Sequence, residues 1–382
     1  MSAIKITSKD RLLILAPHPD DESLATGGLI QRAVKAGAKV RVLFATDGDN
    51  NPWPQRFLER KLKITYTDRA RWGRRRRNEA LAALETLGLP KGSARFLGLP
   101  DQGITKLLMR AEEGVLFTLW AELTEWEPTI FVMPSATDAH PDHSALFVLV
   151  NLALMRLEHP PRLLRFIIHP PRRPSERGKV TVRLTEAEVG RKRAAIMAHE
   201  SQMALSRKRF AAYATEEEIF YNAPLQEQTD HHHPVIGARF DRGALRIQLR
   251  LRGSRPGLAQ MAQGSLLLAL ESATEGSLRW VLPLPGSSKC VPLQDVMTGG
   301  LVRMATVRVT GRRAEVAVPI ANLQPLRHVF VKFQRRVFLK DEAGWRQAPA
   351  MPVAAAEEER GKIRNSLQRA KRGQAGQFEI QK

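Results

Sequence analysis

Two short clusters of histidine and carboxylate residues could do chemistry together. The first is His18-Pro19-Asp20-Asp21-Glu22, and the second, far later in the chain, is His140-Pro141-Asp142-His143. A catalytic zinc ion takes three protein ligands from such side chains and leaves a fourth position open for water. The ion makes that water acidic enough to become a nucleophile near neutral pH. The clusters therefore indicate hydrolysis by metal-activated water.

A ligand set and a base can be chosen from these residues. His18, Asp21 and His143 would give the ion two imidazoles and one carboxylate, which leaves the metal with a net positive charge. Asp20 stands beside one of these ligands and can face the water instead of the metal. It is therefore the predicted general base.

The second cluster also offers His140, which we expect to be catalytic and to be oriented by Asp142. On the flank opposite the base, His140 can stabilise an oxyanion or protonate a leaving nitrogen, and the sequence leaves both roles open. Either cluster alone could simply start a helix, because Asp favours N-cap and first-turn positions. Two clusters that both follow predicted strands make a shared site the better interpretation.

Short apolar runs alternate with longer amphipathic stretches in the first part of the chain. The runs predict strands at 12–15, 40–44, 94–97, 129–133 and 163–168. The stretches between them predict helices at 23–36, 78–87, 112–125 and 144–157. This alternation predicts an α/β domain with a mostly parallel sheet and helices on both faces. Ligands of such a domain bind outside the carboxyl ends of the strands, where both clusters stand.

The pattern changes after Pro224, where runs of alternating apolar and polar residues replace the helical periodicity. Residues 244–252 alternate in this way, and residues 301–319 contain two such runs around Gly311, as in a hairpin. A smaller antiparallel β-sandwich domain is the simplest account. The predicted organisation is a first domain at 1–225, a linker at 226–234, a β-sandwich-like domain at 235–350 and a basic, disordered tail at 351–382.

The chain is strongly basic, with 60 Lys and Arg against 39 Asp and Glu and a formal net charge of +21. This charge favours an anionic substrate, an anionic glycan or the anionic headgroups of an inner membrane leaflet. Arginines of the second domain, such as Arg246 and Arg250, could line the surface that binds them. Aromatic residues make up only 6% and do not interleave with basic ones, which argues against nucleic-acid binding.

The location of the protein can also be predicted from composition. Cys290 is the single cysteine, which excludes a disulfide framework and a thiolate zinc site and fits a reducing compartment. The apolar run at 145–155 is far shorter than the ~20 residues that span a bilayer, and the first residues lack the pattern of a signal peptide. We therefore expect a cytoplasmic protein that can contact the inner membrane peripherally.

The two clusters resemble those of the PIG-L/LmbE family of zinc-dependent N-deacetylases, whose members carry the same two stretches after strands. The resemblance covers about residues 10–222. Weaker features follow in the family's order. They are Thr46-Asp47-Gly48, Arg76 three residues before Glu79, the stretch 96–101 and the stretch 192–202, which ends in His199-Glu200-Ser201-Gln202.

This resemblance implies a Rossmann-like fold and the removal of acetyl groups from glucosamine-containing substrates, such as glycolipids and sugar conjugates. For single residues it implies zinc ligation by His18, Asp21 and His143, a general base at Asp20, a transition-state role for His140, and contacts of Arg76 and Asp101 with the sugar or its attached group.

The stretch around Arg76 is unusually basic and departs from the family. Six arginines lie within nine positions: Arg69, Arg71, Arg74, Arg75, Arg76 and Arg77. They could form the solvated start of a helix, or they could bind a phosphate or carboxylate through bidentate contacts. Of the other histidines, the tract 231–233 is interpreted as a linker. His169, His199 and His328 are interpreted as structural or surface residues, although His199 could also buttress the site.

Three hypotheses about function follow. The first is a zinc-dependent N-deacetylase that removes the acetyl group from an N-acetylglucosamine-type sugar in an anionic glycoconjugate, with one Zn²⁺ or another divalent ion per chain. The second is a zinc amidase that cleaves a different sugar-linked amide, which would not release acetate. The third is a basic protein that binds a glycan or membrane and has a non-catalytic metal site, which would show no turnover.

Overall fold

A computed structural model describes residues 4–170, 178–222, 233–241, 243–250, 264–272, 276–320, 326–335 and 344–348. The chain divides into two compact units. One consists of residues 1–236 and 332–346, and the other of residues 237–331 and 347–382. The predicted tail, Arg252 and most of the predicted linker lie outside the described residues.

The first unit contains a seven-stranded sheet with the strand order β3-β2-β1-β4-β5-β7-β6. Its strands are β1 (Arg11–Ala16), β2 (Lys39–Thr46), β3 (Ala94–Leu99), β4 (Ile130–Pro134), β5 (Arg162–Phe166), β6 (Lys179–Arg183) and β7 (Glu217–Tyr221). The strands from β3 to β5 pair in parallel, whereas β7 runs antiparallel to β5 and β6. The prediction of an α/β unit with a mainly parallel sheet is confirmed.

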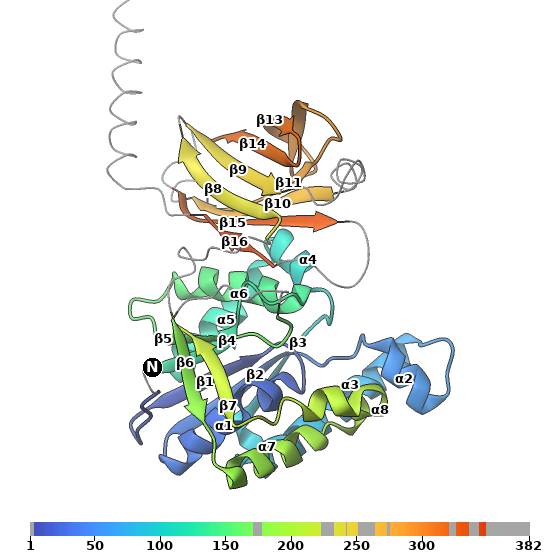
Figure 1. Cartoon of the computed structure of the whole chain (residues 1–382), viewed down its shortest axis with the longest axis vertical. Coiled ribbons are helices and arrows are strands. Elements are labelled where there is room, and N and C mark those ends of the chain that lie inside the picture. The colour runs from blue at the N-terminus through green and yellow to red at the C-terminus, as the bar shows by residue number, and fades with distance from the viewer. Residues whose placement is uncertain are drawn as a thin grey trace, which may run out of the picture. The chain divides into compact units, whose positions relative to one another are not determined.

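Helices lie on both faces of this sheet, with α1, α3 and α7 on one side and α4, α5 and α6 on the other (Figure 1). The helices are α1 (Asp21–Lys35), α2 (Pro52–Glu59), α3 (Tyr66–Thr86), the short 3₁₀ turn η1 (Lys91–Ser93), α4 (Ile104–Met109), α5 (Glu113–Trp126), α6 (Pro141–Leu154), α7 (Glu186–Met197) and α8 (Glu200–Ala211). Because both faces are covered, β1 and β4 are buried along almost their whole length, as their continuous apolar runs require.

Helix α3 begins twelve residues earlier than the predicted helix at 78–87. Its start is a capping box, in which Thr65 Oγ1 accepts a hydrogen bond from the Asp68 amide and the Asp68 carboxylate accepts one from the Thr65 amide at 3.0 Å. Such a box satisfies two amide groups that the first turn of a helix leaves free. The arginine-rich stretch is therefore the first half of a long helix.

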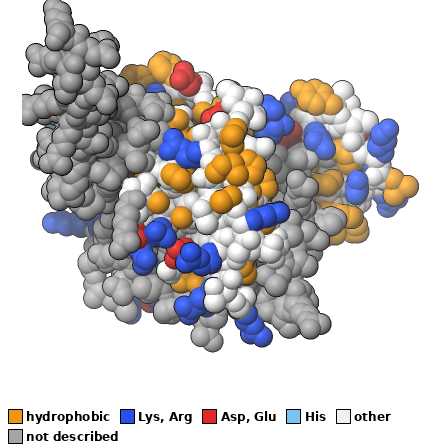
Figure 2. Space-filling model, turned by 90° about the horizontal axis from the view of Figure 1, so that it is seen from above, with side chains coloured by type: hydrophobic (Ala, Val, Ile, Leu, Met, Phe, Trp, Pro, Cys, Tyr) orange, Lys and Arg blue, Asp and Glu red, His pale blue; other side chains and the backbone are white. Residues whose placement is uncertain are grey.

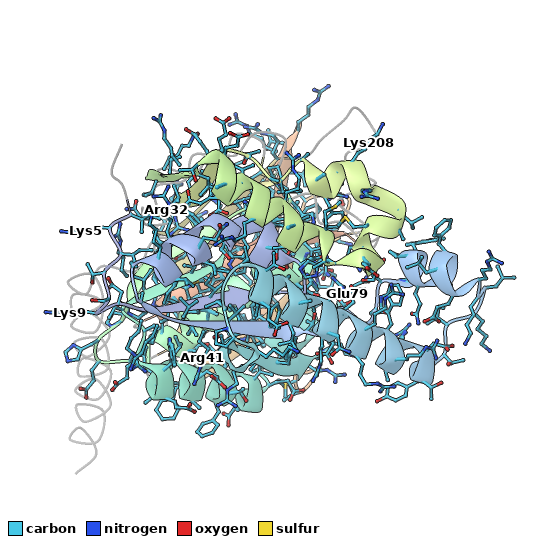
Figure 3. The ribbon with its side chains drawn as sticks, turned by 90° about the horizontal axis from the view of Figure 1, so that it is seen from below. Lys5, Lys9, Arg32, Arg41, Glu79 and Lys208 are labelled. Carbon is cyan, nitrogen blue, oxygen red and sulfur yellow. The ribbon has the colours of Figure 1, made fainter. Side chains whose placement is uncertain are left out.

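Buried polar contacts fix α7 and α8 against the rest of the unit. Lys192 in α7 forms an ion pair with Glu218 at 2.7 Å, and Glu218 also accepts hydrogen bonds from two amides of α1. Glu79 in α3, which is labelled in Figure 3, accepts hydrogen bonds from the amide and hydroxyl of Ser201 in α8. Lys192, Glu79 and Ser201, which lie in the sequence features noted above, thus hold helices together around the strand ends.

The remaining strands form one nine-stranded sheet in the order β16-β15-β10-β11-β12-β13-β14-β9-β8. They are β8 (Val235–Asp241), β9 (Ala244–Arg250), β10 (Gly264–Ser272), β11 (Gly276–Pro283), β12 (Lys289–Asp295), β13 (Leu301–Thr310), β14 (Arg313–Pro319), β15 (Leu326–Arg335) and β16 (Arg346–Gln347). Consecutive strands from β10 to β14, and β14 with β9, pair antiparallel. The predicted hairpin is β13–β14, and its turn holds Gly311 at a φ of 57°, a left-handed conformation that glycine adopts readily.

Along the described ranges, none of the helices combines the length and the apolar composition that crossing a membrane requires.

His233, which the linker interpretation placed in solvent, is buried, and its Nδ1 accepts a hydrogen bond from the Val235 amide at 3.0 Å. The other two histidines of that tract lie outside the described residues.

Candidate metal centre

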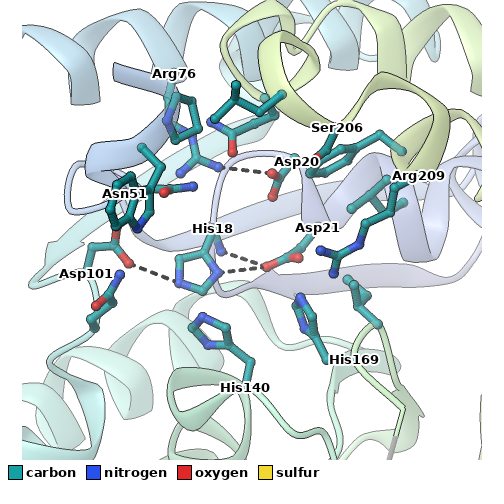
Figure 4. A pocket seen from close by; sticks show the side chains of 18 of the residues that line it. His18, Asp20, Asp21, Asn51, Arg76, Asp101, His140, His169, Ser206 and Arg209 are labelled. Carbon is teal, nitrogen blue, oxygen red and sulfur yellow. Dashed lines mark hydrogen bonds and ion pairs between the residues drawn. The ribbon is translucent and has the colours of Figure 1, made fainter. Parts of the chain in front are cut away.

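The loops that follow the parallel strands of the first unit meet in one pocket of about 720 Å³. His18 and Asp20 follow β1, Asp101 follows β3, His140 follows β4 and His169 follows β5 (Figure 4). Segments far apart in the sequence therefore converge at the carboxyl edge of the sheet, where this class of fold binds its ligands.

At the floor of this pocket, which His18 and Asp21 line, two of their donor atoms form a compact triangle with an atom of the fully buried His143. His18 Nδ1 lies 3.2 Å from Asp21 Oδ2, His143 Nε2 lies 3.2 Å from the same oxygen, and the two imidazole nitrogens are 3.4 Å apart. Ligand atoms at about 2.1 Å from a tetrahedral ion lie roughly 3.4 Å from one another. The spacing of the three atoms therefore fits one shared metal ion.

The electrostatics of the floor also fit a cation. Burial would lower the pKa of His143, but the carboxylates of Asp138 and Asp21 outweigh it and raise that pKa to about 10. For Asp21, burial is likewise outweighed by the two neighbouring imidazoles, which lower the pKa of its carboxyl well below the usual range. The carboxylates thus favour positive charge at this point, as a metal site requires.

In each of the two histidines, the ring nitrogen that does not belong to the triangle contacts carboxylates. His143 Nδ1 lies 3.2 Å from Asp138, and His18 Nε2 lies 3.2 Å from Asp101 and 3.3 Å from Asp142. Metal-binding histidines usually donate their second ring N–H to such a group, which fixes the tautomer and turns the other nitrogen towards the ion. Both rings therefore present one nitrogen to the triangle.

Asp138 is a site residue that the sequence interpretation missed. It is fully buried, and its carboxylate accepts hydrogen bonds from the amides of His140, Ile168 and His169 in addition to facing His143. Its position two residues before the second cluster was the available signal. The carboxylate joins the loop after β4 to the loop after β5.

One predicted contact differs in the structure, and a second stays a prediction. Asp142 was expected to orient His140, but its carboxylate faces His18 and accepts hydrogen bonds from the amides of Gln102 and Ile104. Asp101, which was expected to touch the sugar, lines the pocket. One of its oxygens faces His18, and the other accepts a hydrogen bond from the Asn50 amide at 2.7 Å. The partners of both side chains come from loops that follow other strands.

Asp20 has a conformation that a simple helix cap would not need. It is the N-cap of α1, yet its side chain makes no capping hydrogen bond, and its φ is 143°. A non-glycine residue in such a conformation costs of order 1–3 kcal/mol and points to a functional constraint. Burial, assisted by Asp21 and opposed by Arg76, raises the pKa of Asp20 to about 6. A carboxyl group with that pKa is suited to accept a proton near neutral pH.

Arg76, which was predicted to contact substrate, lines the pocket and also hydrogen bonds to the loops around it. It is 3% exposed and donates hydrogen bonds to the carbonyl oxygens of Pro19 and Gly48 and to Asp20 Oδ2 at 3.1 Å (Figure 4). Gly48 has a positive φ, and a Cβ there would lie 1.9 Å from Arg76 Nη1. The arginine and the glycine together hold the loop that carries Asp20.

The other arginines of the basic stretch are mostly paired along α3. Arg77 contacts both oxygens of Asp47, Arg75 lies 2.9 Å from Glu79, and Arg71 contacts Glu59 and Asp68. These contacts favour the helix interpretation of the stretch over a phosphate-binding cluster.

His140 is oriented by the backbone of its own helix. Its Nδ1 accepts a hydrogen bond from the Asp142 amide at 3.3 Å, so the ring proton is placed on Nε2. Burial and the nearby rings of His18 and His143 lower the pKa of His140 to about 2. A ring with its proton on Nε2 can donate a hydrogen bond from that nitrogen.

Two histidines interpreted as structural or surface residues lie at or beside the pocket. His169 lines it, with Nδ1 3.3 Å from Asp138. His199 is buried, and its Nε2 lies 2.9 Å from Glu22. Because Glu22 also accepts a hydrogen bond from the Asp20 amide, this pair supports the loop that carries Asp20, as the predicted buttress role implies.

Three overlapping groups of side chains could hold a metal ion: His18, His140 and His143; Asp138, His143 and His169; and His18, Asp101 and Asp142.

Comparison with known proteins agrees with the resemblance inferred from the two clusters. Residues 13–154 match the family model PIG-L: GlcNAc-PI de-N-acetylase. The matched range includes both clusters and Arg76.

Curated relatives and solved structures cover the same part. The chain is similar to the 1D-myo-inositol 2-acetamido-2-deoxy-alpha-D-glucopyranoside deacetylases of Mycobacterium avium (strain 104), at 32% identity over 35% of this chain and 47% of the relative, and of Mycobacterium sp. (strain KMS), at 30% identity over 39% and 51%. It thus spans about half the length of these relatives. A conserved protein of known structure from Thermus thermophilus is 26% identical over 56% of this chain and 95% of that chain, with a TM-score of 0.42.

Proposed function

We propose that the protein is a metal-dependent hydrolase, with zinc as its ion, that removes the N-acetyl group from an N-acetylglucosamine-type sugar in a glycoconjugate. The observation that carries the proposal is the donor triangle of His18, Asp21 and His143 with the carboxylate of Asp20 beside it at the floor of a pocket. The activity named for the curated relatives, which is deacetylation of an acetamido sugar, supports the choice of bond.

The proposed ligands are His18, Asp21 and His143, and the bound ion would activate water and polarise the amide carbonyl. Asp20 takes a proton as water adds to the carbonyl carbon. It then passes the proton to the nitrogen as the C–N bond breaks, so that acetate and a free amine leave. Because His140 Nδ1 accepts the Asp142 amide, its Nε2 carries the ring proton, and we propose that this nitrogen donates a hydrogen bond to the developing oxyanion. This assignment selects the first of the two roles left open by the sequence.

Asp101, Asp138 and Asp142 are proposed to act through the histidines that they face. They hold the two imidazoles in the tautomers that leave His18 Nδ1 and His143 Nε2 free to bind the ion. Arg76 is proposed to be a positioning residue for Asp20, because its three hydrogen bonds all end on the loops around that carboxylate.

An anionic substrate is supported by Arg209 of α8, which lines the pocket (Figure 4). Arg209 interacts with the Tyr213 side chain, and among the residues that the structure describes no ion pair joins it to an acidic side chain, so its charge is available to a carboxylate or phosphate of the substrate. We also propose that the nine-stranded sheet belongs to an accessory domain of the β-sandwich type. From the single cysteine we propose a reducing, cytoplasmic compartment.

The test of the proposed function is an acetate-release assay with the zinc-loaded protein. Substrates should include N-acetylglucosaminyl inositol, N-acetylglucosamine lipids, nucleotide sugars and polysaccharide fragments. We expect one acetate and one free amine per turnover with at least one of them, and faster turnover for anionic than for neutral substrates. Release of a different acid would favour the amidase hypothesis. Stoichiometric zinc without turnover on any of these substrates would favour a non-catalytic metal site.

Replacing Arg76 with glutamine should change the pH profile of the reaction. The Arg76 guanidinium lowers the pKa of Asp20, so its removal raises that pKa above about 6. Because the base must be deprotonated, the acid limb of kcat/KM should move to higher pH by about one unit or more. The matched control is Arg75→Gln on the same helix, which should leave the limb in place. Identical limbs in both variants would remove Arg76 from this role.

A further inference from the structure

An unusual concentration of exposed apolar side chains lies on and just after α2. Among the described residues, eleven large hydrophobic side chains are exposed, and five of them fall within residues 53–66. These five are Trp53, Phe57, Leu58, Leu62 and Tyr66, and Leu62 and Tyr66 are 94% and 85% exposed. We call this set, together with the basic residues Arg56, Arg60, Lys61, Lys63 and Arg69, the α2 patch.

The segment is held in place by polar groups on its inner side, so its apolar side chains point outward in a defined fold. The buried Gln55 donates a hydrogen bond to the Asp68 carbonyl at 2.8 Å, and the carboxylate of Asp68 binds Lys61 and Arg71. Arg60 ends the helix in a left-handed conformation with a φ of 52°. A segment with polar contacts inside and apolar groups outside is built to meet a non-aqueous surface.

The charge around these apolar groups is positive. Residues 52–71 contain six Lys and Arg against two acidic residues, Glu59 and Asp68, and both acids are occupied by Lys61 and Arg71. Arg60 and Lys63 are exposed beside Leu62. In Figure 2, hydrophobic and basic side chains are interspersed on the lobe at the right, where α2 lies in Figure 1.

This combination selects one kind of partner. Tryptophan, tyrosine and leucine side chains insert at the boundary between headgroups and acyl chains, and neighbouring Lys and Arg bind anionic headgroups. An anionic glycan would use the cations but not Leu62 or Phe57. A twofold contact between two copies of the chain would bring like charges together.

We propose that the α2 patch docks the protein on a bilayer that contains anionic phospholipid. The patch continues into the pocket, because Pro52, Trp53 and Pro54 line it together with His18 and Asp20. A docked bilayer would therefore lie at the rim of the site and could present a lipid-linked substrate to it. The basic residues of the second sheet are weaker candidates, since Arg246 is paired with both Asp241 and Glu315.

Vesicle co-sedimentation of the full-length protein tests the proposal. The probes are vesicles of phosphatidylcholine alone and vesicles in which part of it is replaced with phosphatidylglycerol. One double variant, Phe57→Ser with Leu62→Ser, removes apolar groups, and another, Arg60→Gln with Lys63→Gln, removes charges. Trp53 is left unchanged because it lines the pocket. The matched controls are Phe117→Ser, a comparably exposed aromatic on α5, and Lys5→Gln with Lys35→Gln.

We expect the wild type to bind the anionic vesicles at least tenfold more tightly than the neutral ones, with a loss at high salt. The charge variant should lose about fivefold in affinity per cation, the apolar variant at least tenfold, and the controls should match the wild type. Equal binding to both vesicle types, or wild-type binding by the two α2 variants, would overturn the proposal. So would a wild-type dimer in solution that the Phe57→Ser, Leu62→Ser variant converts to a monomer. Binding requires no catalysis, so these outcomes are independent of the proposed hydrolysis.

Discussion

Replacing Asp20 with asparagine should lower kcat by about 10²–10⁴ while the protein keeps its fold and its metal ion. The amide has nearly the shape of the carboxylate but cannot accept a proton from water. Asp20 itself is not one of the three donors of the triangle, so metal content should be unchanged. The measurement is steady-state turnover of the metal-loaded variant together with its metal-to-protein ratio.

Asp47→Asn is the matched control for this experiment. Asp47 lies in the loop after β2 and forms an ion pair with Arg77 outside the pocket lining, so this variant should stay within a few-fold of the wild-type rate. A fully metallated Asp20→Asn protein that turns over as fast as the Asp47→Asn protein would show that Asp20 is not the base.

Replacing His143 with alanine should abolish stoichiometric metal binding and, with it, turnover. The substitution removes one of three donors and leaves Asp138 and Asp21 without the ring between them. Removing only the carboxylate behind the ring, as in Asp138→Asn, should weaken metal affinity by about 10–100-fold. The loss for His143→Ala should be larger than this, which gives a graded series that a purely structural role would not produce.

The readout besides activity is the metal-dependent part of the free energy of unfolding. An ion that binds only the folded state stabilises it by about 4 kcal/mol when its free concentration is 1,000 times Kd. The wild type should gain stability of this order on addition of zinc, and His143→Ala should gain almost none. The alanine cavity lowers the free energy of unfolding equally with and without metal, so it cancels when the two values for one protein are subtracted. His159→Ala, at an exposed position, is the control. A full zinc-dependent gain in His143→Ala would exclude His143 as a ligand.

Much of the first unit could be predicted because its signals are local. The apolar runs at 12–15, 40–44 and 129–133 fall within or beside β1, β2 and β4, since strands covered on both faces need continuous apolar sequence. The meeting of the two clusters followed from the rule that parallel strands end at one edge of a sheet. The early start of α3 was missed, although Thr65 and Asp68 have the spacing of a capping box.

Side-chain partners were harder to predict because each depends on residues from several loops. Asp101, Asp142 and Arg76 are all at the site, but their contacts are set by amides and carbonyls that the sequence does not bring near them. His169 could have been found by the strand-end rule, since it follows β5. In the second sheet, alternation identified β9 and the β13–β14 hairpin, while the pairing order of the nine strands is non-local and leaves no such signal.

The most direct test of the account is anomalous diffraction at the zinc edge from a crystal of the zinc-loaded protein. We expect one strong peak within bonding distance of His18 Nδ1, Asp21 Oδ2 and His143 Nε2. A main peak between Asp138, His143 and His169, or between His18, Asp101 and Asp142, would contradict the proposed ligand set. A zinc-loaded crystal with no peak in the pocket would contradict the metal centre itself.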